Sequence, residues 1–547
     1  MLQHWLSRRS WRRLGLYVSL SGCCLLLVLG CRSNQTPSGS TASSAETRIA
    51  IGTTAKVRTL DPADALEIFA GNLLYNMGDR LYTYASGSTQ LVPQLATALP
   101  KVSEDGLLYT IPLRTKVLFH DGTPFNAKAM AFSLNRFIQN GGQPAFLLKD
   151  TVASVTANSE TELTLRLKKP FASFPNLLAF SGLVAVSPKA YKIGPGEFQP
   201  STFVGTGPYK LSSSGSDSIR LEPNPTYWGD KPQNKGIDIQ SFSSSANLFN
   251  AFRTGAVDIA YQSLNPDQIA SLDKTAQQGD WQGITGSGNN ITYLSLNLRD
   301  PVLKDKAVRQ ALGLVINRKL IQDRVFSGQV EPLYSLIPSI FKESKPVFEE
   351  SDAEASLAKA KELLSKAGYS KGKPMKLQMW YRSNVPSDAP AATTIKAYIA
   401  QELGDLIDLE LNSVESATAY TNLDKGTYPM FMLDWSGDYY DPDTYIHPFL
   451  HCAKGSPAKG CEEGSTVGQG SFYFSPKMNQ LIDQQRQETN PTKRDQVFAE
   501  IQKLLAEDVP FLPLWQRKEY VFAQRDVEGV RLEPTQALGF GSLSRKG

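Results

Sequence analysis

The stretch Met375-Lys376-Leu377-Gln378-Met379-Trp380-Tyr381 decides the fold class. Its apolar side chains recur at every second residue, which is the pattern of a β-strand. Residues 391–403 then have helical periodicity, and residues 407–414 and 428–434 again have the pattern of strands. This strand–helix–strand order predicts an α/β fold with an open, largely parallel sheet.

A helix is expected before that strand, between residues 351 and 368. Ser351 and Glu354 have the spacing of a capping box, and Gly368 stands where a helix would stop. Four apolar residues would share one face of this helix: Leu357, Ala360, Leu364 and Ala367.

The first half of the chain shows the same two periodicities. Strands are expected at residues 49–53, 107–113 and 162–168, and a helix at residues 126–138 with Asn126 as its cap. Hydrophobic residues make up 41% of the chain, as in ordinary globular proteins. Because a single core stops growing near about 250–300 residues, a chain of 547 residues predicts at least two lobes.

The amino terminus has the composition of a secretory signal peptide. Residues 1–13 contain four arginines and no acidic residue, and residues 14–29 are mainly apolar. The apolar segment is shorter than the roughly 20 residues of a membrane helix, although an uncleaved anchor is the alternative. Val28-Leu29-Gly30-Cys31 is similar to a lipoprotein cleavage motif. We therefore expect residues 1–30 to be removed and Cys31 to carry a lipid.

We prefer Cys31 to Cys23 as the lipidated residue because the residues directly after Cys31 are polar. Residues 31–47 are rich in Ser and Thr and contain no large apolar residue, which predicts a flexible tether. The predicted location is extracytoplasmic and membrane-anchored. The Arg8-Arg9 pair leaves open whether export follows the general or the twin-arginine route.

The charge balance argues against a nucleic-acid partner. Four of the 57 basic residues and none of the 53 acidic residues lie in residues 1–30, so the rest of the chain is formally neutral. A nucleic-acid-binding protein would need a basic face or stripe.

Two cysteines remain beyond the tether, Cys452 and Cys461. In an exported protein such a pair is expected to form a disulfide. His447 and His451 lie just upstream and leave a metal site open as the alternative, but the spacing matches no common zinc module.

The loop after the strand at residues 428–434 holds the densest polar chemistry of the chain. In open α/β sheets, ligands bind beyond the carboxyl ends of the strands, which also points to the loop after Tyr381. Residues 434–443 contain four carboxylates and three aromatic side chains. Carboxylates and aromatic faces together favour a pocket for a cationic group. A solvated loop with an Asp-Pro turn is the plain alternative, and the spacing of a calcium loop is missing.

Eight short motifs, in order, carry a resemblance to a known family. They are Thr59-Leu60-Asp61-Pro62; residues 119–127, Phe-His-Asp-Gly-Thr-Pro-Phe-Asn-Ala; residues 204–209, Val-Gly-Thr-Gly-Pro-Tyr; residues 224–228, Asn-Pro-Thr-Tyr-Trp; Gly255-x-Val257-Asp258-Ile259; residues 305–312, Asp-Lys-Ala-Val-Arg-Gln-Ala-Leu; Asn317-Arg318; and Trp435-x-x-Asp438-Tyr439-x-Asp441-Pro442. Over about residues 48–540 the chain resembles the peptide- and nickel-type extracellular solute-binding proteins of family 5. One motif alone would mean little, but eight in order are specific.

The resemblance implies a two-lobed clamshell of the large peptide-binding class, with mixed sheets and a hinge. Lobe I would take residues 48–288, including an extra subdomain, and residues 506–547; lobe II would take residues 289–505. The hinge would lie at Asn290–Leu298 and Asp508–Gln524. Such a receptor would capture di- or oligopeptides by lobe closure and deliver them, as a monomer, to the permease of an ATP-binding-cassette importer.

The resemblance also assigns site residues. In peptide-binding members, the Asp of the Trp-x-x-Asp-Tyr motif pairs with the peptide amino group, and Asp438 stands at that position. Arg382 lies where members place carboxylate-contacting groups, and its guanidinium suits that task; the alternative is an ordinary surface arginine. Trp435, Tyr439 and Trp380 are expected to line the pocket, or else to belong to the core.

Two other functions were weighed. A nickel- or metal-chelate-binding member is the first alternative, although the chain has only four histidines. A secreted serine hydrolase is the second, because residues 368–372 match Gly-x-Ser-x-Gly around Ser370. A nucleophile elbow needs a strand before the serine and a helix after it, and the expected order here is reversed. We therefore expect no enzyme, no cofactor and no resident metal. The His120-Asp121 pair and the glycines of residues 204–209 are expected to be structural.

Overall fold

The computed structural model describes residues 48–349 and 352–546. The predicted signal peptide, the lipidation of Cys31 and the tether fall outside the described residues, as does Ser351. The described residues belong to one compact unit. Within them, no helix combines the length and the apolar character that crossing a membrane requires.

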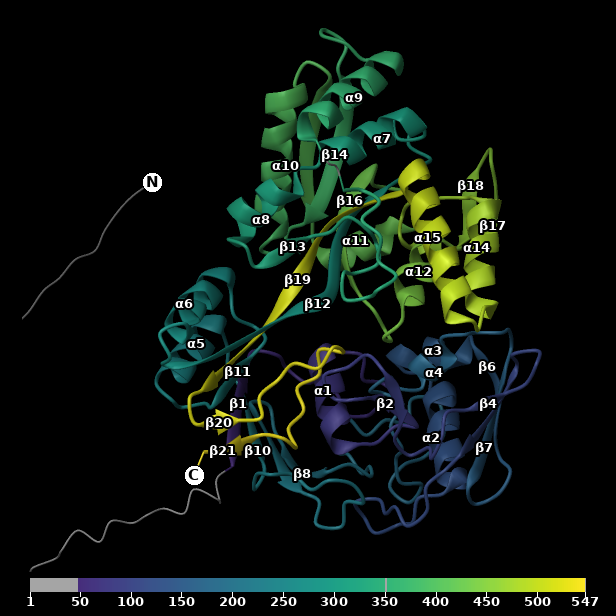
Figure 1. Ribbon diagram of the computed structural model, residues 1–547, viewed down its shortest axis with the longest axis vertical. Helices are drawn as coiled ribbons and strands as arrows, with labels where there is room; N and C mark the ends of the chain where they lie inside the picture. The colour runs from purple at the N-terminus through teal and green to yellow at the C-terminus, as the bar shows by residue number, and fades with distance from the viewer. Residues whose placement is uncertain (1–47, 350–351, 547) are drawn as a thin grey trace, which may run out of the picture. The chain divides into compact units, whose positions relative to one another are not determined.

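One mixed sheet of eleven strands runs through this unit (Figure 1). In order across the sheet, its strands are β15 (Ile407–Val414), β14 (Met375–Arg382), β16 (Met430–Ser436), β12 (Trp281–Leu296), β19 (Phe511–Gln524), β11 (Ile259–Tyr261), β1 (Ile49–Thr53), β10 (Ile237–Ser241), β9 (Ser218–Pro223) and β8 (Tyr209–Ser214), with β13 (Val330–Pro332) beside β19. Strand β14 is parallel to both its neighbours, and so is β1. The other pairs are antiparallel. The expectation of a largely parallel sheet is therefore wrong for the sheet as a whole.

The two longest strands, β12 with 16 residues and β19 with 14, join the two ends of the sheet. Trp281–Ser287 pairs with one half of β19, and Ile291–Ser295 pairs with the other half. The register is irregular between Ser287 and Ile291. A Cβ on Gly288 would lie 2.6 Å from the Arg517 carbonyl oxygen, so the two backbones approach closely there.

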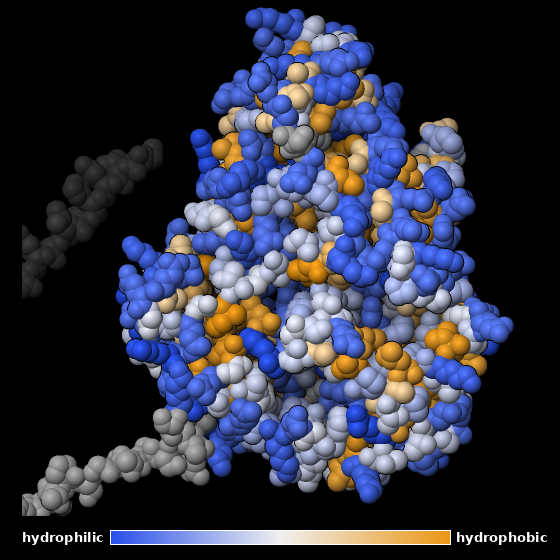
Figure 2. Space-filling view, viewed as in Figure 1, coloured by the Kyte–Doolittle hydropathy of each residue, from blue (hydrophilic) through white to orange (hydrophobic). Residues whose placement is uncertain are grey.

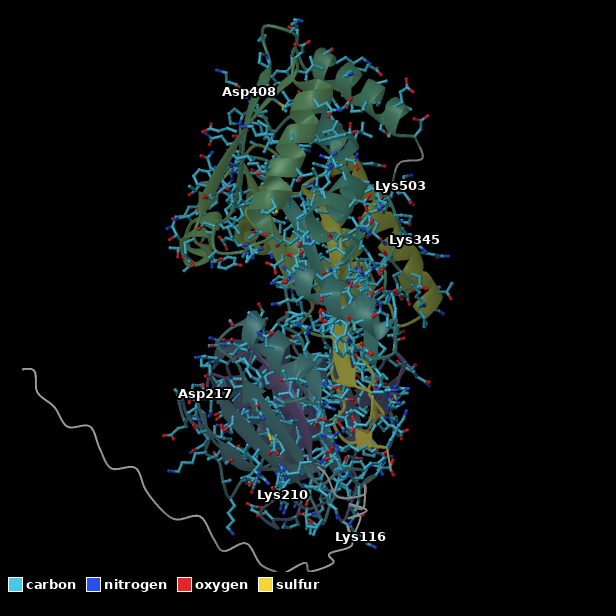
Figure 3. The ribbon with its side chains drawn as sticks, turned by 90° about the vertical axis from the view of Figure 1, so that its left-hand side faces the viewer. Lys116, Lys210, Asp217, Lys345, Asp408 and Lys503 are labelled. Atoms are coloured by element: carbon cyan, nitrogen blue, oxygen red, sulfur yellow. A yellow bond between two sulfur atoms is a disulfide. The ribbon has the colours of Figure 1, made fainter. Side chains whose placement is uncertain are left out.

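The buried apolar residues divide into clusters that define two lobes. One large cluster, drawn from residues between Ile291 and Trp515, is the core of what we call lobe II. Three others, drawn from residues 49–272 and 521–543, form the cores of lobe I. Figure 3 shows Asp408, Lys345 and Lys503 on lobe II, and Lys116, Lys210 and Asp217 on lobe I. On the face shown in Figure 2, apolar residues form separate patches in a mainly polar surface.

Lobe II contains the elements that the sequence predicted best. Its helices are α7 (Lys306–Val315), α8 (Arg318–Phe326), α9 (Ala353–Lys366), α10 (Asp388–Leu403), α11 (Ser416–Leu423), η2 (Pro442–Tyr445), α12 (His447–Leu450), α13 (Ser465–Gly468), α14 (Pro476–Gln487) and α15 (Pro491–Asp508). Strands β14, β15 and β16 confirm the three predicted strands within two residues at either end. Helix α9 is capped by Asp352, whose carboxylate accepts from the Glu354 and Ala355 amides. Helix α10 begins three residues earlier than predicted.

Lobe I combines its part of the large sheet with a separate four-stranded sheet. That sheet has the order β4 (Lys101–Val102), β5 (Leu108–Pro112), β7 (Glu162–Leu167) and β6 (Val152–Ala157). The helices of lobe I are α1 (Ile68–Met77), α2 (Ala127–Gln139), η1 (Gln143–Ala145), α3 (Phe146–Lys149), α4 (Phe174–Leu177), α5 (Ser245–Arg253) and α6 (Pro266–Ala276). Short strand pairs are β2 (Tyr82–Tyr84) with β3 (Leu91–Pro93), and β20 (Val527–Glu528) with β21 (Ser544–Arg545). The predicted strands in β1, β5 and β7 are confirmed, and Asn126 caps α2 by accepting from the Ala129 amide.

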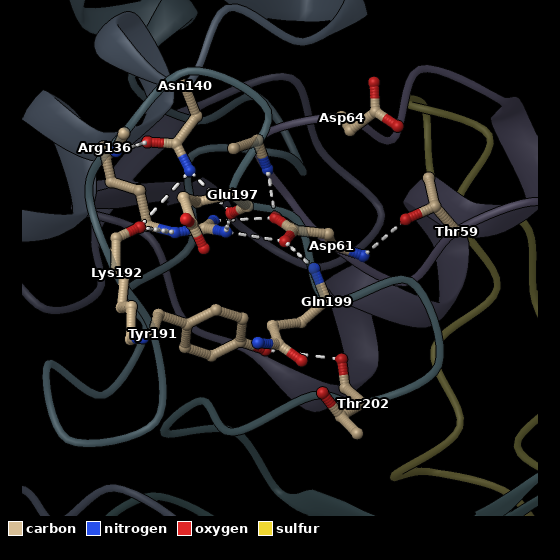
Figure 4. A network of polar contacts seen from close by, with 12 residues as sticks. Thr59, Asp61, Asp64, Arg136, Asn140, Tyr191, Lys192, Glu197, Gln199 and Thr202 are labelled. Carbon is tan, nitrogen blue, oxygen red and sulfur yellow. Dashed lines mark hydrogen bonds and ion pairs between the residues drawn. The ribbon is translucent and has the colours of Figure 1, made fainter.

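The Thr59-Leu60-Asp61-Pro62 motif has a structural task, visible in Figure 4. Asp61 forms two hydrogen bonds of 2.6 and 2.7 Å with Arg136 of α2, and both side chains are at most 1% exposed. The Gln199 amide also donates to Asp61, at 2.6 Å. This buried pair fixes the first loop of the chain against α2.

The hairpin of β17 (Cys452–Ser456) and β18 (Gly460–Gly464) contains the disulfide between Cys452 and Cys461. Because the two sulfurs bond each other, neither is a thiolate that could hold a metal. His447 and His451 stack with their ring centroids 4.6 Å apart.

The two motifs that resembled active-site sequences make structural contacts. His120 accepts from the Gly205 amide at 3.3 Å, and its other ring nitrogen lies 3.1 Å from the Gly207 carbonyl oxygen. Burial lowers the pKa of His120 to about 4, so this side chain is neutral at pH 7. A Cβ on Gly207 would lie 2.3 Å from the Met77 backbone, so the glycine permits close packing against α1.

Candidate functional site

A cavity of about 360 Å³ lies between the two lobes. This volume is within the range of small-molecule sites. The lobe I residues of its lining are 65–68, Gly71, Asn72, Tyr75, 83–84, Asn176, 179–181, Tyr261, Glu533 and 535–537, and the lobe II residues are Asn289, Phe341, 436–440 and Tyr445.

The walls of this cavity are rich in aromatic side chains from both lobes. The lining aromatics are Tyr75, Tyr84, Phe180, Tyr261, Phe341, Tyr439, Tyr440 and Tyr445. Tyr440 links the walls, with its ring centroid 4.6 Å from that of Phe341 and 5.4 Å from that of Tyr84. Aromatic faces are electron-rich, so this lining suits apolar groups and cations.

Asp438 reaches the cavity from a turn that follows β16. The Gly437 amide donates to the Tyr445 hydroxyl and the Asp438 amide to Thr444 Oγ1, both at 3.1 Å. A Cβ on Gly437 would lie 2.5 Å from the Thr444 methyl carbon, so a larger residue would displace the turn. These contacts explain why a glycine precedes Asp438, and they hold the backbone from which the Asp438 side chain extends.

The Asp438 carboxylate has no hydrogen bond or ion pair with any residue that the structure describes. Burial raises the pKa of this carboxyl to about 6. The other two carboxylates of the lining are already paired, Glu67 with Arg58 at 2.7 Å and Glu533 with Arg531 at 2.9 Å. The described lining contains no lysine or arginine. Asp438 is therefore a partly buried negative charge without a partner among the described residues.

Among the predicted wall residues, the structure places only Tyr439 in the described lining of this cavity. Its ring lies 5.9 Å from that of Phe171 in lobe I, and its hydroxyl donates to Asp443 at 2.7 Å. Trp435 packs on Phe449 at 5.6 Å, and Trp380 on Tyr428 at 5.1 Å. Both tryptophans belong to the lobe II core instead, which was the alternative interpretation.

Arg382 is placed differently from the expectation. It lies outside the cavity lining, and its guanidinium pairs with Asp388 at 3.1 Å and with Asp434. Parallel pairing puts β14 beside β16, and α10 begins six residues after Arg382, so both carboxylates come to the same guanidinium. With its charge compensated in the lobe II core, Arg382 has no contact to offer a ligand in this arrangement.

A further acid of the same loop, Asp441, contacts both lobes, a role the sequence did not reveal. Asp441 accepts from Arg494 at 2.7 and 2.8 Å and from Asn176 of lobe I at 3.1 Å. Arg494 also donates to Ser173 of lobe I at 2.6 Å. We call this cluster of Asp441, Arg494, Asn176 and Ser173 the interlobe cluster.

The neighbouring Asp443 supports that cluster from within lobe II. It is fully buried and contacts Arg486 at 3.2 Å, Gln485 and the Tyr439 hydroxyl. Neither pair could be read from local sequence patterns, because Arg486 and Arg494 lie on helices more than 40 residues further along the chain.

Comparison with known proteins then identifies the family. The sequence model of the family described as "Bacterial extracellular solute-binding proteins, family 5 Middle" matches residues 90–457 of this chain. The chain belongs to this family. Among family 5 relatives, it is 26% identical over 510 residues to a probable D,D-dipeptide-binding periplasmic protein, DdpA, of Escherichia coli K12, covering 91% of this chain and 94% of that one. The family resemblance inferred from the motifs is thus confirmed.

Two solved structures share the fold of this chain. HbpA2 of Haemophilus parasuis superposes with a TM-score of 0.79 at 22% identity, covering 92% of this chain and all of that one. DppA of Helicobacter pylori, in complex with the peptide STSA, gives 0.71 at 23% identity, covering 92% and 99%. The predicted fold class, a two-lobed α/β clamshell with a mixed sheet, is therefore confirmed.

Proposed function

We propose that this protein captures peptides with a free amino terminus and delivers them to an ATP-binding-cassette importer. The observation that carries the proposal is the unpaired Asp438 carboxylate in an aromatic cavity between two lobes. The names of its relatives agree, since DdpA is called dipeptide-binding and DppA was solved with a tetrapeptide. Membership in a solute-binding family supports a proposed role in transport instead of catalysis.

The ammonium group of the ligand would pair with Asp438. At this position the ammonium replaces the water that the carboxylate has lost, and the two desolvated charges compensate each other. Tyr439 and Tyr440 flank Asp438 and line the same wall, which favours a cation. Apolar parts of the ligand would lie against the remaining aromatic faces.

Lobe closure would occur about the crossing of β12 and β19, and the closed form would dock on the permease. We propose lobe boundaries at residues 48–288 for lobe I and 289–515 for lobe II, with the return to lobe I after Trp515 instead of at the expected residue 506, because Phe511, Leu512 and Trp515 pack in the lobe II core. The register irregularity between Ser287 and Ile291 lies at this crossing. We also propose that the protein is a monomer outside the cytoplasm. A lipid on Cys31 would hold it near its transporter.

The test is isothermal titration calorimetry of the purified protein with dipeptides. Asp438→Ala and Asp438→Asn should each lower the affinity by about 2–5 kcal/mol, because each leaves the ammonium buried without its partner. N-acetylation of the peptide should weaken binding to the wild type by a similar factor. It should cause little further loss in Asp438→Asn, since the same interaction is already missing.

Unchanged affinity in both variants would refute the role of Asp438. Quenching of tryptophan fluorescence by nickel salts, with no response to peptides, would favour the metal-chelate alternative instead.

A further inference from the structure

Arg80 is a buried cation without an adequate partner. It lies between α1 and β2 and is 1% exposed. Its Nε and Nη1 atoms have no hydrogen-bond partner among residues 48–349 and 352–546. Its Nη2 atom donates a long hydrogen bond of 3.4 Å to Thr83 Oγ1.

The adjacent Asp79 does not relieve this charge by a hydrogen bond, because its own carboxylate is saturated. One oxygen accepts from Gln94 at 2.9 Å and Tyr227 at 3.1 Å, and the other from Thr206 at 2.8 Å and Trp228 at 2.9 Å. Four donors fill the acceptor capacity of a carboxylate.

Leaving donors unpaired inside a protein is unfavourable, and more so for a charged group. Burial accordingly lowers the pKa of Arg80. Native proteins contain few buried polar groups without hydrogen-bond partners, and each one calls for an explanation. One explanation is that the group forms its hydrogen bonds only when a ligand binds.

The surroundings of Arg80 connect it to the cavity. Its guanidinium carbon lies 4.6 Å from the ring centroid of Tyr75. Tyr75, Thr83 and the neighbouring Tyr84 all line the cavity, whereas Arg80 itself does not. Stacking on Tyr75 covers one face of the guanidinium, and the buried Nε and Nη1 donors in its plane remain without a partner among the described residues. A ligand would reach these donors past Thr83.

The backbone of Arg80 is held on both sides. Its amide donates to Gln94 Oε1 at 2.8 Å, and its carbonyl accepts from the Leu95 amide at 2.9 Å. A fixed backbone lowers the entropy that binding would otherwise lose.

We infer that Arg80 and Thr83 form an anion subsite of this cavity, which receives the carboxylate of the ligand. The carboxylate would accept from the free edge of the Arg80 guanidinium, beside the Thr83 hydroxyl. Together with Asp438 on lobe II, the cavity would then hold one cationic and one anionic group of a zwitterion. The inference rests on the proposed function, because it concerns the other end of the same ligand. It also supplies the carboxylate contact that Arg382 does not make.

The experiment compares a dipeptide with a free carboxyl terminus and the same dipeptide as its amide, by calorimetry on the full protein. The wild type should prefer the free acid by about tenfold or more, as expected for a charge-assisted hydrogen bond. Arg80→Met should lose this preference, and Arg80→Lys should retain part of it. Thr83→Val, which keeps the shape of the side chain, should reduce it.

Two controls separate this inference from the proposed function. Asp438→Asn should weaken both peptides equally and keep the ratio of acid to amide. Arg114→Met removes another arginine stacked at 4.6 Å on an aromatic ring, that of Trp228, and should also keep the ratio.

A wild type that binds neither peptide would overturn the proposed function, and the inference with it. A wild type that binds both peptides equally, or an Arg80→Met variant that keeps the full preference, would overturn the inference alone. If Arg80→Met fails to fold, Thr83→Val decides, since an unchanged ratio in that variant would refute the subsite.

Discussion

Lowering the pH from 7 to 5 should weaken peptide binding about tenfold. Burial raises the pKa of Asp438 to about 6. On that value, about nine-tenths of the Asp438 carboxyls are ionised at pH 7 and about one-tenth at pH 5. An ammonium group pairs only with the ionised form, so the association constant falls in the same proportion. The loss corresponds to about 1.4 kcal/mol of binding free energy.

The sign of this effect follows from the direction of the pKa shift. A carboxyl whose pKa is raised by burial holds its proton longer than a solvated one. A bound ammonium favours the charged form and lowers the pKa again. Binding near pH 6 should therefore release about half a proton for each peptide. At high pH a second decline should begin, because the peptide amino group loses its proton near about pH 8.

The assay is calorimetry at several pH values, repeated in two buffers with different ionisation enthalpies. The difference between the buffers gives the number of protons released. Asp438→Asn is the matched control, because it keeps the shape of the side chain and cannot ionise. This control also separates the titration of Asp438 from that of Glu519 on β19. Burial raises the pKa of Glu519 to about 7, so Glu519 titrates in the same pH range.

Two results would refute the reasoning. Affinity that stays constant between pH 7 and pH 5 would show that the Asp438 charge does not pair with the ligand. A tenfold decline that persists in Asp438→Asn would assign the pH dependence to another group.

Three further predictions concern stability and can be measured by urea denaturation. Arg494→Met should lower the free energy of unfolding by about 3–5 kcal/mol, because Asp441 would remain buried and unpaired; a change below about 1 kcal/mol would contradict a buried role for this pair. Arg136→Met should cause a loss of about 3–5 kcal/mol in lobe I for the same reason, and Arg136→Lys should recover only part of it, since a single ammonium cannot replace the two hydrogen bonds. Replacing Cys452 and Cys461 together by Ser should cost about 2–3 kcal/mol, as expected for a short closed loop, and should leave peptide affinity unchanged because the hairpin lies outside the cavity lining.

Local sequence patterns predicted the individual elements well. The alternation of β14 and the Asn126 cap of α2 depend on residues a few positions apart, and both are present in the structure. The sequence did not reveal that the sheets of the two lobes are continuous. That continuity depends on the pairing of β12 with β19, strands more than 200 residues apart.

The site was predictable only in part, for a similar reason. The family motif around Trp435 pointed to Asp438, and the structure places Asp438 in the cavity lining because this motif is a single local turn. Arg382 was assigned to the ligand because a lone arginine after a strand gives no sign of its partners. Asp388 and Asp434 meet it only once β14 lies beside β16. Nothing in the sequence around Arg80 marks it, because what distinguishes it is that its buried Nε and Nη1 atoms have no hydrogen-bond partner among the described residues.

The pairing of β12 with β19 has a mechanical consequence for a receptor that opens and closes. The lobes are joined by a hydrogen-bonded two-stranded ribbon, not by two independent linkers. Movement between them would then twist the ribbon, and a twisted ribbon stores elastic energy that resists large excursions. Amide protons of the paired segments on either side of the crossing should exchange slowly with solvent in both the empty and the filled receptor. A single proteolytic cut in one strand of the ribbon should leave the two halves of the receptor together.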